Sequence, residues 1–313
     1  MRVGLVAIGR NEGARLAACL RAAARDVQSF VYVDSGSTDD SLQIAQSLGA
    51  EIVRLDLSIP FTAARSRNAG FARLISLDPS IELVQFIDGD CELVEGWIPT
   101  AAQFLAATPK AAVVCGRRRE RFPDASRYNA MCDLEWNTPI GRAKSCGGDA
   151  LMRVTAFQQA GGYNDAVIAG EEPELCVRLR KAGFEIHRID AEMTLHDAAM
   201  TRFGQWWKRN VRAGHAYAEG FDMHGAPPEN FRRKEVVSNY VWATPVMWLL
   251  WPLLWIKIYR GRRNGLYATF VTLSKLPQAI GQLTFLWNRL RGKRTMLIEY
   301  KNPIPAPGAL GER

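Results

Sequence analysis

The chain has 313 residues, of which 48% are hydrophobic and 23% are charged, and its formal net charge is +8. This composition supports a substantial hydrophobic core and excludes a disordered or collagen-like polypeptide. Residues 1–200 carry 22 lysines and arginines against 26 acidic residues, whereas residues 201–313 carry 18 against 6. The basic last third therefore indicates an anionic partner, either nucleic acid or a membrane that contains acidic lipids.

The first part of the chain alternates short apolar runs with segments of helical periodicity. Residues 3–8 predict a buried strand, and residues 12–25 follow with alanine, leucine and arginine at helical spacing. The unit repeats with a strand that ends at Val33, a helix from about 39 to 48 and a strand over 52–55. This alternation predicts an α/β fold in which helices flank a mostly parallel central sheet.

A third helix over 61–78 and a strand over 83–88 extend the pattern. Asp34 and Asp88 lie at the ends of two predicted strands, and Asp90 follows Asp88 after a single glycine. Because ligands of such sheets bind at the carboxyl ends of the strands, we expect these carboxylates to converge. Their oxygens suit a hard divalent cation, Mn²⁺ or Mg²⁺, although a surface turn built on Asp-Gly explains the same triplet.

The pattern becomes irregular in the middle of the chain. Residues 147–149 predict a turn before a short strand, and residues 161–190 predict a loop, a helix and a strand. Glu171 and Glu172 precede Pro173, which suits the first position of that helix. On this evidence Glu172 either caps the helix or takes part in a reaction.

Two further features have more than one interpretation. Asp34 and Asp39 could accept hydrogen bonds from a ribose or a base, although Asp39 or Thr38 also suits a helix N-cap. The six cysteines show no CxxC or zinc-ligand spacing, so we predict reduced thiols that are mostly core residues.

Six segments of the chain follow one another in the same order as the motifs of a known family. They are VAIGRNEGARLAACL, VYVDSGSTDDS, FTAARSRNAG, FIDGDCEL, GGDALMR and GEEPELCVRLRKAGFEI, and they fall within residues 3 to about 190. Together they resemble the family 2 glycosyltransferases of the GT-A fold. The resemblance implies a nucleotide-diphosphate sugar donor, most commonly UDP-linked, a divalent metal ion and inversion at the anomeric carbon.

The resemblance assigns seven residues to the nucleotide pocket. They match positions that line the pocket, hold the base and ribose, or lie near the diphosphate: Asn11, Glu12, Asp34, Asp39, Arg65, Asn68 and Asp88. Either Arg65 or Arg67 could pair with a phosphate. Asp90 matches the direct metal ligand, and Asp88 would face both the ribose and the metal.

The same resemblance assigns the residues of the reaction. Glu172 matches the general base and Glu171 precedes it, but the family usually has Glu-Asp here, so this chain departs by one methylene group. His196 matches a histidine that several relatives use as a further metal ligand, and a structural role remains the alternative. Gln205 and Arg209 match part of the Q-x-x-R-W signature of processive relatives, but asparagine replaces the tryptophan.

The last third has the character of a membrane-associating region. Residues 236–256 lack charge, contain four tryptophans and two prolines, and are long enough to cross a bilayer, which favours a membrane over nucleic acid. Basic clusters flank this segment and the similar segment 266–287. They fit helices that lie in the cytoplasmic leaflet better than a spanning hairpin, and a soluble helix pair is the remaining alternative. We therefore predict a catalytic domain over 1–225 and a basic, tryptophan-rich, membrane-associating region over 226–313.

The predicted activity is transfer of a sugar to a hydroxyl of a lipid-linked or cell-surface glycan at the cytoplasmic face of the inner membrane. The apolar N-terminal run is too short for a signal peptide, which agrees with this location. Two alternatives remain, a sugar-nucleotide nucleotidyltransferase and a non-catalytic membrane-bound scaffold. A nucleotidyltransferase needs a glycine-rich phosphate loop after the first strand, and GRNEGAR is a poor version of such a loop. The carboxylates of Asp88, Asp90 and Glu172 argue against a non-catalytic scaffold.

Overall fold

Parallel strands form one half of the central sheet, as the alternating sequence pattern predicts. The computed structural model describes residues 1–293, and residues 294–313 of the predicted C-terminal region lie outside the described residues. The strands are β1 Val3–Gly9, β2 Ser29–Asp34, β3 Glu51–Arg54, β4 Leu83–Asp88, β5 Cys91–Leu93, β6 Ala111–Glu120, β7 Gly141–Ala143, β8 Ala150–Arg153 and β9 Glu185–His196. Their order is β3-β2-β1-β4-β8-β6-β9-β5, with β7 paired to β9. The first four strands are parallel to one another, whereas β8 runs antiparallel to both β4 and β6.

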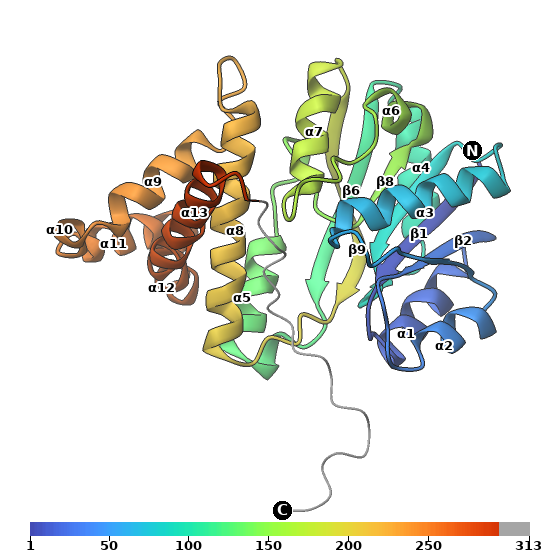
Figure 1. Ribbon diagram of the computed structural model, residues 1–313, viewed down its shortest axis with the longest axis horizontal. Helices are drawn as coiled ribbons and strands as arrows, with labels where there is room; N and C mark the ends of the chain where they lie inside the picture. The colour runs from blue at the N-terminus through green and yellow to red at the C-terminus, as the bar shows by residue number, and fades with distance from the viewer. Residues whose placement is uncertain (294–313) are drawn as a thin grey trace, which may run out of the picture.

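Helices cover both faces of this sheet (Figure 1). They are α1 Ala14–Ala23, α2 Ser41–Ser47, α3 Ala63–Leu77, α4 Trp97–Ala107, α5 Arg127–Trp136, α6 Val154–Gln159, α7 Glu171–Lys181, α8 Phe203–His224, α9 Arg233–Ala243, α10 Pro245–Trp248, α11 Trp251–Arg262, α12 Gly265–Leu273 and α13 Lys275–Leu290. On one face α1, α2 and α4 pack through a core that includes Leu20 and Trp97. On the other face α3, α6 and α7 pack through Phe71, Phe157 and Leu175. Burial of each such side chain contributes about 1.5–3 kcal/mol, so both helical layers are firmly attached to the sheet.

The uncharged segment 236–256 forms parts of three helices, α9, α10 and α11, instead of one. Pro245 and Pro252 stand in the first turns of α10 and α11. A proline there can begin a helix but cannot continue the preceding one, because it lacks the N–H donor. Among residues 1–293, no helix is both long enough and apolar enough to cross a bilayer.

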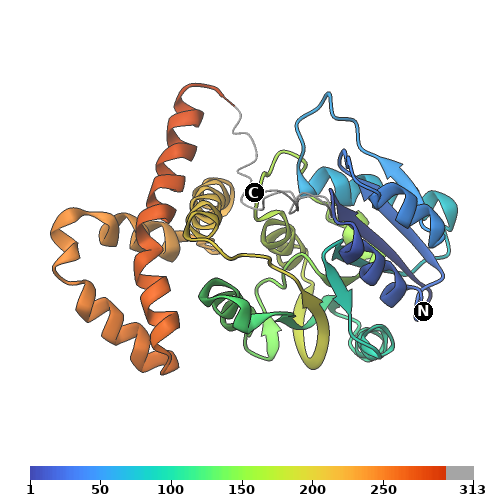
Figure 2. The same cartoon turned by 90° about the horizontal axis from the view of Figure 1, so that it is seen from below.

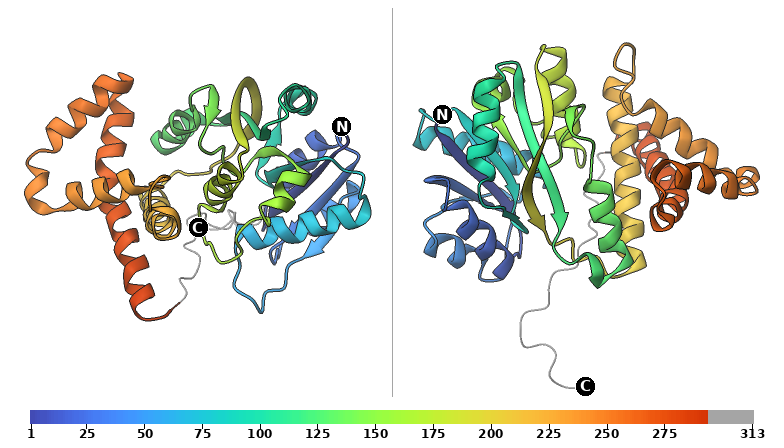
Figure 3. Two further views of the ribbon diagram at one scale, coloured as in Figure 1. Left: turned by 90° about the horizontal axis from the view of Figure 1, so that it is seen from above. Right: turned by 180° about the vertical axis from the view of Figure 1, so that it is seen from behind.

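Two helices of the last third, α8 and α13, cross with their backbones in contact (Figure 2). A Cβ atom on Gly214 of α8 would lie 1.9 Å from the carbonyl oxygen of Gln278, and one on Gly281 of α13 would lie 1.9 Å from that of Val211. Glycine at both positions is therefore what lets α13 lie so close to α8. The boundary predicted near residue 225 falls in the turn after α8, and α8 itself joins the C-terminal helices to the sheet domain (Figure 3).

We predict that Gly214→Ala lowers the free energy of unfolding by about 1–3 kcal/mol, because the added methyl group would force the two helices apart. The matched control is Gly204→Ala, in the first turn of the same helix, where an added Cβ meets no atom within 4 Å. Chemical denaturation measures both changes. Equal stability of the two variants would show that the close contact between α8 and α13 does not require glycine at position 214.

Candidate functional site

A cavity of about 740 Å³ opens at the carboxyl ends of the parallel strands. Its walls come from the loops after β1, β2 and β4, from the first turns of α3 and α7, and from one side of α8. Six of the predicted site residues line it: Asn11, Glu12, Asp88, Asp90, Glu171 and Glu172. The convergence expected at the strand ends is present only in part, because Asp88 and Asp90 line the cavity whereas Asp34 does not.

The loops after β1 and β2 are tied together beside the cavity. The backbone N–H of Asn11 donates to Ser37 Oγ at 2.9 Å, and Asn11 Oδ1 accepts from the N–H of Thr38 at 2.7 Å. Buried Asp34 stabilises the loop after β2, because its Oδ2 accepts hydrogen bonds from the N–H groups of Gly36 and Ser37, each at 3.0 Å. Asp34 thus shapes the pocket without lining it.

Like Asp34, three further predicted nucleotide-binding residues do not line the cavity, and their side chains have other partners. Asp39 Oδ1 accepts from the N–H of Ser41 at the start of α2, but the N-cap of this helix is Asp40, so neither Asp39 nor Thr38 is the cap residue. Arg65 donates to the carbonyl oxygens of residues 56, 59 and 60, and Asn68 donates to the carbonyl of Tyr163. Their placement corrects the expectation that Asp39, Arg65 and Asn68 face a ligand, because each one stabilises a neighbouring loop instead.

Arg67 is the arginine of α3 that does line the cavity. Its side chain is 3% exposed and lies between two carboxylates, with Nη2 at 2.6 Å from Asp88 Oδ1 and Nη1 at 2.5 Å from Glu171 Oε1. Burial alone would lower the pKa of Arg67, but the two carboxylates outweigh burial and raise it. A permanent positive charge therefore joins β4, α3 and α7.

A second buried ion pair lies directly behind Asp88. Asp149, which is fully buried, forms an ion pair with Arg118 Nη2 at 2.6 Å and accepts hydrogen bonds from Thr194 Oγ1 at 3.0 Å and from the backbone N–H of Asp88 at 3.2 Å. Sequence reasoning did not predict that Arg118 pairs with Asp149. The one signal was the position of Asp149 in GGDALMR, directly after two glycines.

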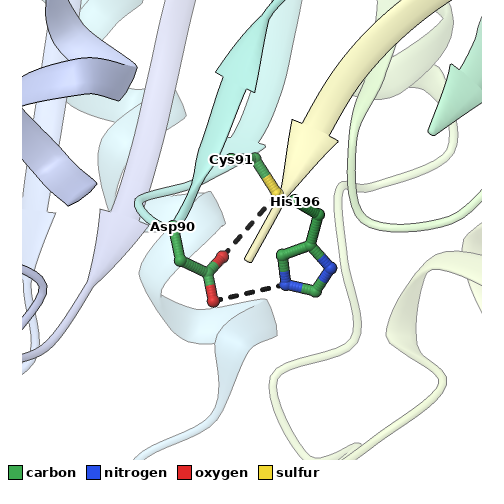
Figure 4. A group of neighbouring side chains, drawn as sticks. All are labelled: Asp90, Cys91 and His196. Atoms are coloured by element: carbon green, nitrogen blue, oxygen red, sulfur yellow. Dashed lines mark hydrogen bonds and ion pairs between the residues drawn. The ribbon is translucent and has the colours of Figure 1, made fainter. Parts of the chain in front are cut away.

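Asp90 and His196 face each other beside the cavity (Figure 4). His196 Nε2 lies 3.3 Å from Asp90 Oδ2, and Trp136 at the end of α5 packs on the imidazole with ring centroids 4.6 Å apart. Burial, together with the positive charge of Arg118, lowers the pKa of His196 to about 4, so the ring is neutral and keeps a lone pair at neutral pH. The Cys91 thiol donates to Asp90 Oδ1 at 3.6 Å.

This donor set fits a divalent metal ion. Carboxylate oxygen and neutral imidazole nitrogen are ligands that Mn²⁺ accepts, and Asp88 lines the same cavity. Nδ1 of His196 is buried and has no hydrogen-bond partner among residues 1–293, so the imidazole is not fully committed to a structural role. Cys91 is less suited, because burial raises the pKa of its thiol well above the ordinary value.

The opposite wall of the cavity is basic and comes from the last third of the chain. Arg209 and Arg212 of α8 line it together with Arg232, while Arg10 and Arg15 line the side near β1. Arg209 also pairs with Glu135 of α5 at 2.7 Å. Positive charge on two sides of a metal-ligating group suits a ligand with several negative charges.

Glu172 lines the cavity from the first turn of α7, which begins at Glu171 and not, as predicted, at Pro173. The helix starts earlier because Gly170, in the left-handed conformation, ends the preceding loop. Glu172 Oε1 accepts from the Cys146 N–H at 2.7 Å and from the thiols of Cys146 and Cys176 at 3.0 and 2.9 Å. Its position is therefore fixed by sulfur and amide donors.

This arrangement of sheet, helices and cavity is that of the GT-A class of glycosyltransferases. The family model described as glycosyl transferase family 2 matches residues 6–158 of this chain, just under half of its length. The chain is 29% identical over 209 residues to the succinoglycan biosynthesis protein ExoA of Rhizobium meliloti, an alignment that covers 63% of this chain and 62% of ExoA. The chain thus spans less than two thirds of that relative.

Solved structures show the same fold. The mannosyltransferase PcManGT from Pyrobaculum calidifontis, in complex with GDP-Man and Mn²⁺, has a TM-score of 0.64 at 15% identity and covers 92% of this chain and 88% of its own. Glucosyl-3-phosphoglycerate synthase from Mycobacterium tuberculosis, in complex with Mn²⁺, UDP and glucosyl-3-phosphoglycerate, has a TM-score of 0.52 at 17% identity, with 72% and 81% covered. At these identities the likeness establishes the fold alone.

We predict that Arg67→Met lowers the free energy of unfolding by about 3 kcal/mol, because Asp88 and Glu171 both lose their closest ion pair. Adding Glu171→Gln removes one of these charges and should recover part of the loss. Denaturant titration of the single and double variants measures the coupling. A double variant no more stable than Arg67→Met would contradict the ion-pair account.

Proposed function

We propose that the protein transfers a sugar from a nucleotide-diphosphate donor to a hydroxyl acceptor by a metal-assisted single displacement with inversion. The observation that carries the proposal is the meeting of two acidic pairs, Asp88 with Asp90 and Glu171 with Glu172, in one basic cavity at the strand ends. A cavity of this size accommodates a nucleotide and a sugar. The similarity to ExoA, which is named for succinoglycan biosynthesis, supports a glycan product.

The nucleotide end of the donor belongs beside the linked loops after β1 and β2. Asn11, Glu12 and Thr38 line this part of the cavity and offer acceptors and donors for a ribose and a base. We propose UDP as the nucleotide, as the family resemblance implies. The PcManGT complex contains GDP-Man, so GDP is the alternative to test.

Asp90 and His196, with Asp88 beside them, would hold Mn²⁺ or Mg²⁺. When bound, the ion supplies positive charge that neutralises the diphosphate as it leaves. Arg209, Arg212 and the other cavity arginines would bind the remaining phosphate oxygens, and their fixed positions would orient the sugar for attack.

Glu172 is the proposed general base. It lines the cavity, while Arg67 holds the adjacent Glu171 as one half of an ion pair. Oε2 of Glu172 has no hydrogen-bond partner among the described residues, whereas Oε1 is bound by Cys146 and Cys176. Oε2 is thus the oxygen that would accept the proton of the attacking hydroxyl, and Glu171 with Arg67 would position it.

The first test is Glu172→Gln, which keeps the size of the side chain and removes the basic oxygen. We expect the rate of transfer to fall by about 10²–10⁴-fold with donor binding retained. A panel of UDP- and GDP-sugars with Mn²⁺ measures transfer, and Glu95→Gln, at an exposed site, is the control. An undiminished rate would exclude Glu172 as the base, and synthesis of nucleotide sugar from a sugar phosphate would favour a nucleotidyltransferase.

We also propose that the C-terminal helices bind the cytoplasmic face of the inner membrane. Large apolar side chains are exposed along α10, α11 and the turn between them, including Leu249 of the turn at 83% and Leu253 of α11 at 61%. Lys257, Arg260 and Arg263 are exposed at the end of α11, next to these side chains in sequence. An acidic bilayer complements both features, and α10 and α11 lie at the end of the molecule farthest from the sheet (Figure 1). Such a location suits a lipid-linked or membrane-proximal acceptor.

Membrane binding is tested with Leu249→Asp/Leu253→Asp, which should weaken binding to vesicles containing phosphatidylglycerol by about tenfold or more. The matched control is Leu77→Asp/Ile140→Asp, two exposed apolar residues outside the C-terminal helices. Co-sedimentation at low and high salt measures binding, which should weaken as salt screens the arginines. Equal binding of both double variants would contradict the proposed surface.

A further inference from the structure

A second group of metal-ligating side chains lies behind the first turn of α7. Cys146 precedes β8, and Glu172 and Cys176 stand four residues apart on α7, so that their ligand atoms all lie within 4.8 Å of one another. Two sulfurs and one carboxylate from two segments of the chain therefore meet at one largely buried point.

Glu172 carries a buried charge that lacks an ionic partner in this group. The residue is 2% exposed, and within residues 1–293 no lysine or arginine forms an ion pair with it. Its Oε2 is buried without a hydrogen-bond partner, in contrast to Glu171, which is neutralised by Arg67. A buried, incompletely satisfied carboxylate beside two thiols is an arrangement that a cation would stabilise.

The chemistry of the donors distinguishes this group from Asp90 and His196. Oxygen and imidazole nitrogen suit Mn²⁺ or Mg²⁺, whereas thiolates select softer ions such as Zn²⁺ and Cd²⁺. In the ion-free protein burial raises the pKa of Cys176 to about 12, so the thiol is neutral. On binding, each ligating thiol would release its proton to solvent and form a metal–sulfur bond of about 2.3 Å with zinc.

An ion can reach this group from the cavity. Cys146 is only half-buried, and the following Gly147 lines the cavity. The space beside Gly147 is open, since a Cβ atom there would meet nothing within 4 Å. Glu172 belongs both to the lining of the cavity and to the cysteine group, so the two sites share this side chain.

We propose that Cys146, Glu172 and Cys176 form a binding site for a soft divalent ion such as Zn²⁺, and that its occupation inhibits the enzyme. The bound ion would hold the Glu172 carboxylate, so Glu172 Oε2 would no longer be available to take the proton of an acceptor hydroxyl. Inhibition rests on the proposed role of Glu172 as base, whereas ion binding does not depend on it.

The binding site is tested first, without any sugar donor. Titration of the reduced protein with Cd²⁺ should give ultraviolet thiolate-to-metal absorption that saturates at one equivalent. Cys146→Ser/Cys176→Ser should lose this absorption, whereas Asp90→Ala/Cys91→Ser and Cys132→Ser should retain it. Circular dichroism confirms folding, and the single variants Cys146→Ala and Cys176→Ala replace the double variant if it does not fold. No thiolate absorption in the wild type, or full absorption without Cys146 and Cys176, would overturn the proposal.

The second arm measures the rate of transfer at saturating Mn²⁺ without and with micromolar Zn²⁺. The ratio of these two rates is then compared between the proteins. The wild type should be inhibited at least tenfold, and Cys146→Ser/Cys176→Ser should show a ratio near one. Equal inhibition of both proteins would overturn the inhibitory role even if Cd²⁺ binds as expected. If no donor supports transfer, the proposed function fails while the absorption experiment still decides the metal site.

Discussion

The guanidinium of Arg67, held between Asp88 and Glu171, is the interaction on which the arrangement of the site depends. Two carboxylates from distant parts of the chain would repel each other in a partly buried cavity. Arg67 compensates both of them and fixes α7 against the end of β4. Arg118 forms a similar buried ion pair with Asp149 behind Asp88, so fixed positive charges place Asp88 and Glu171 before any metal ion binds.

The C-terminal helices connect the two surfaces that the proposed function requires. α8 contributes Arg209 and Arg212 to the cavity, and on its other side it contacts α13 through Gly214 and Gly281. The exposed apolar side chains of α10 and α11 continue from the same group of helices. In the proposed account, a single helical layer would thus set both the orientation of the cavity toward the bilayer and the basic wall that binds phosphate.

Much of the sheet domain could be predicted, because strands β1 to β4 and helices α1 to α3 are local patterns of apolar residues. The choice between Arg65 and Arg67 could not, since two residues along a helix differ by about 200° in direction and only the packing of α3 fixes its rotation. Arg118 and Asp149 are far apart in sequence, so the two glycines before Asp149 mark its position but nothing local identifies Arg118 as its partner. Helix α5 was missed for a similar reason, because its stabilising partners lie on β9 and α12.

Calorimetric titration of UDP and GDP, with and without Mn²⁺, into the wild type and Asp90→Ala tests the central claim most directly. The account predicts that one of the two nucleotides binds the wild type much more tightly with Mn²⁺ and that Asp90→Ala removes this dependence on the metal. Binding of equal strength without the ion, or an unchanged metal effect in Asp90→Ala, would contradict a metal-dependent nucleotide-sugar site built on Asp88, Asp90 and His196.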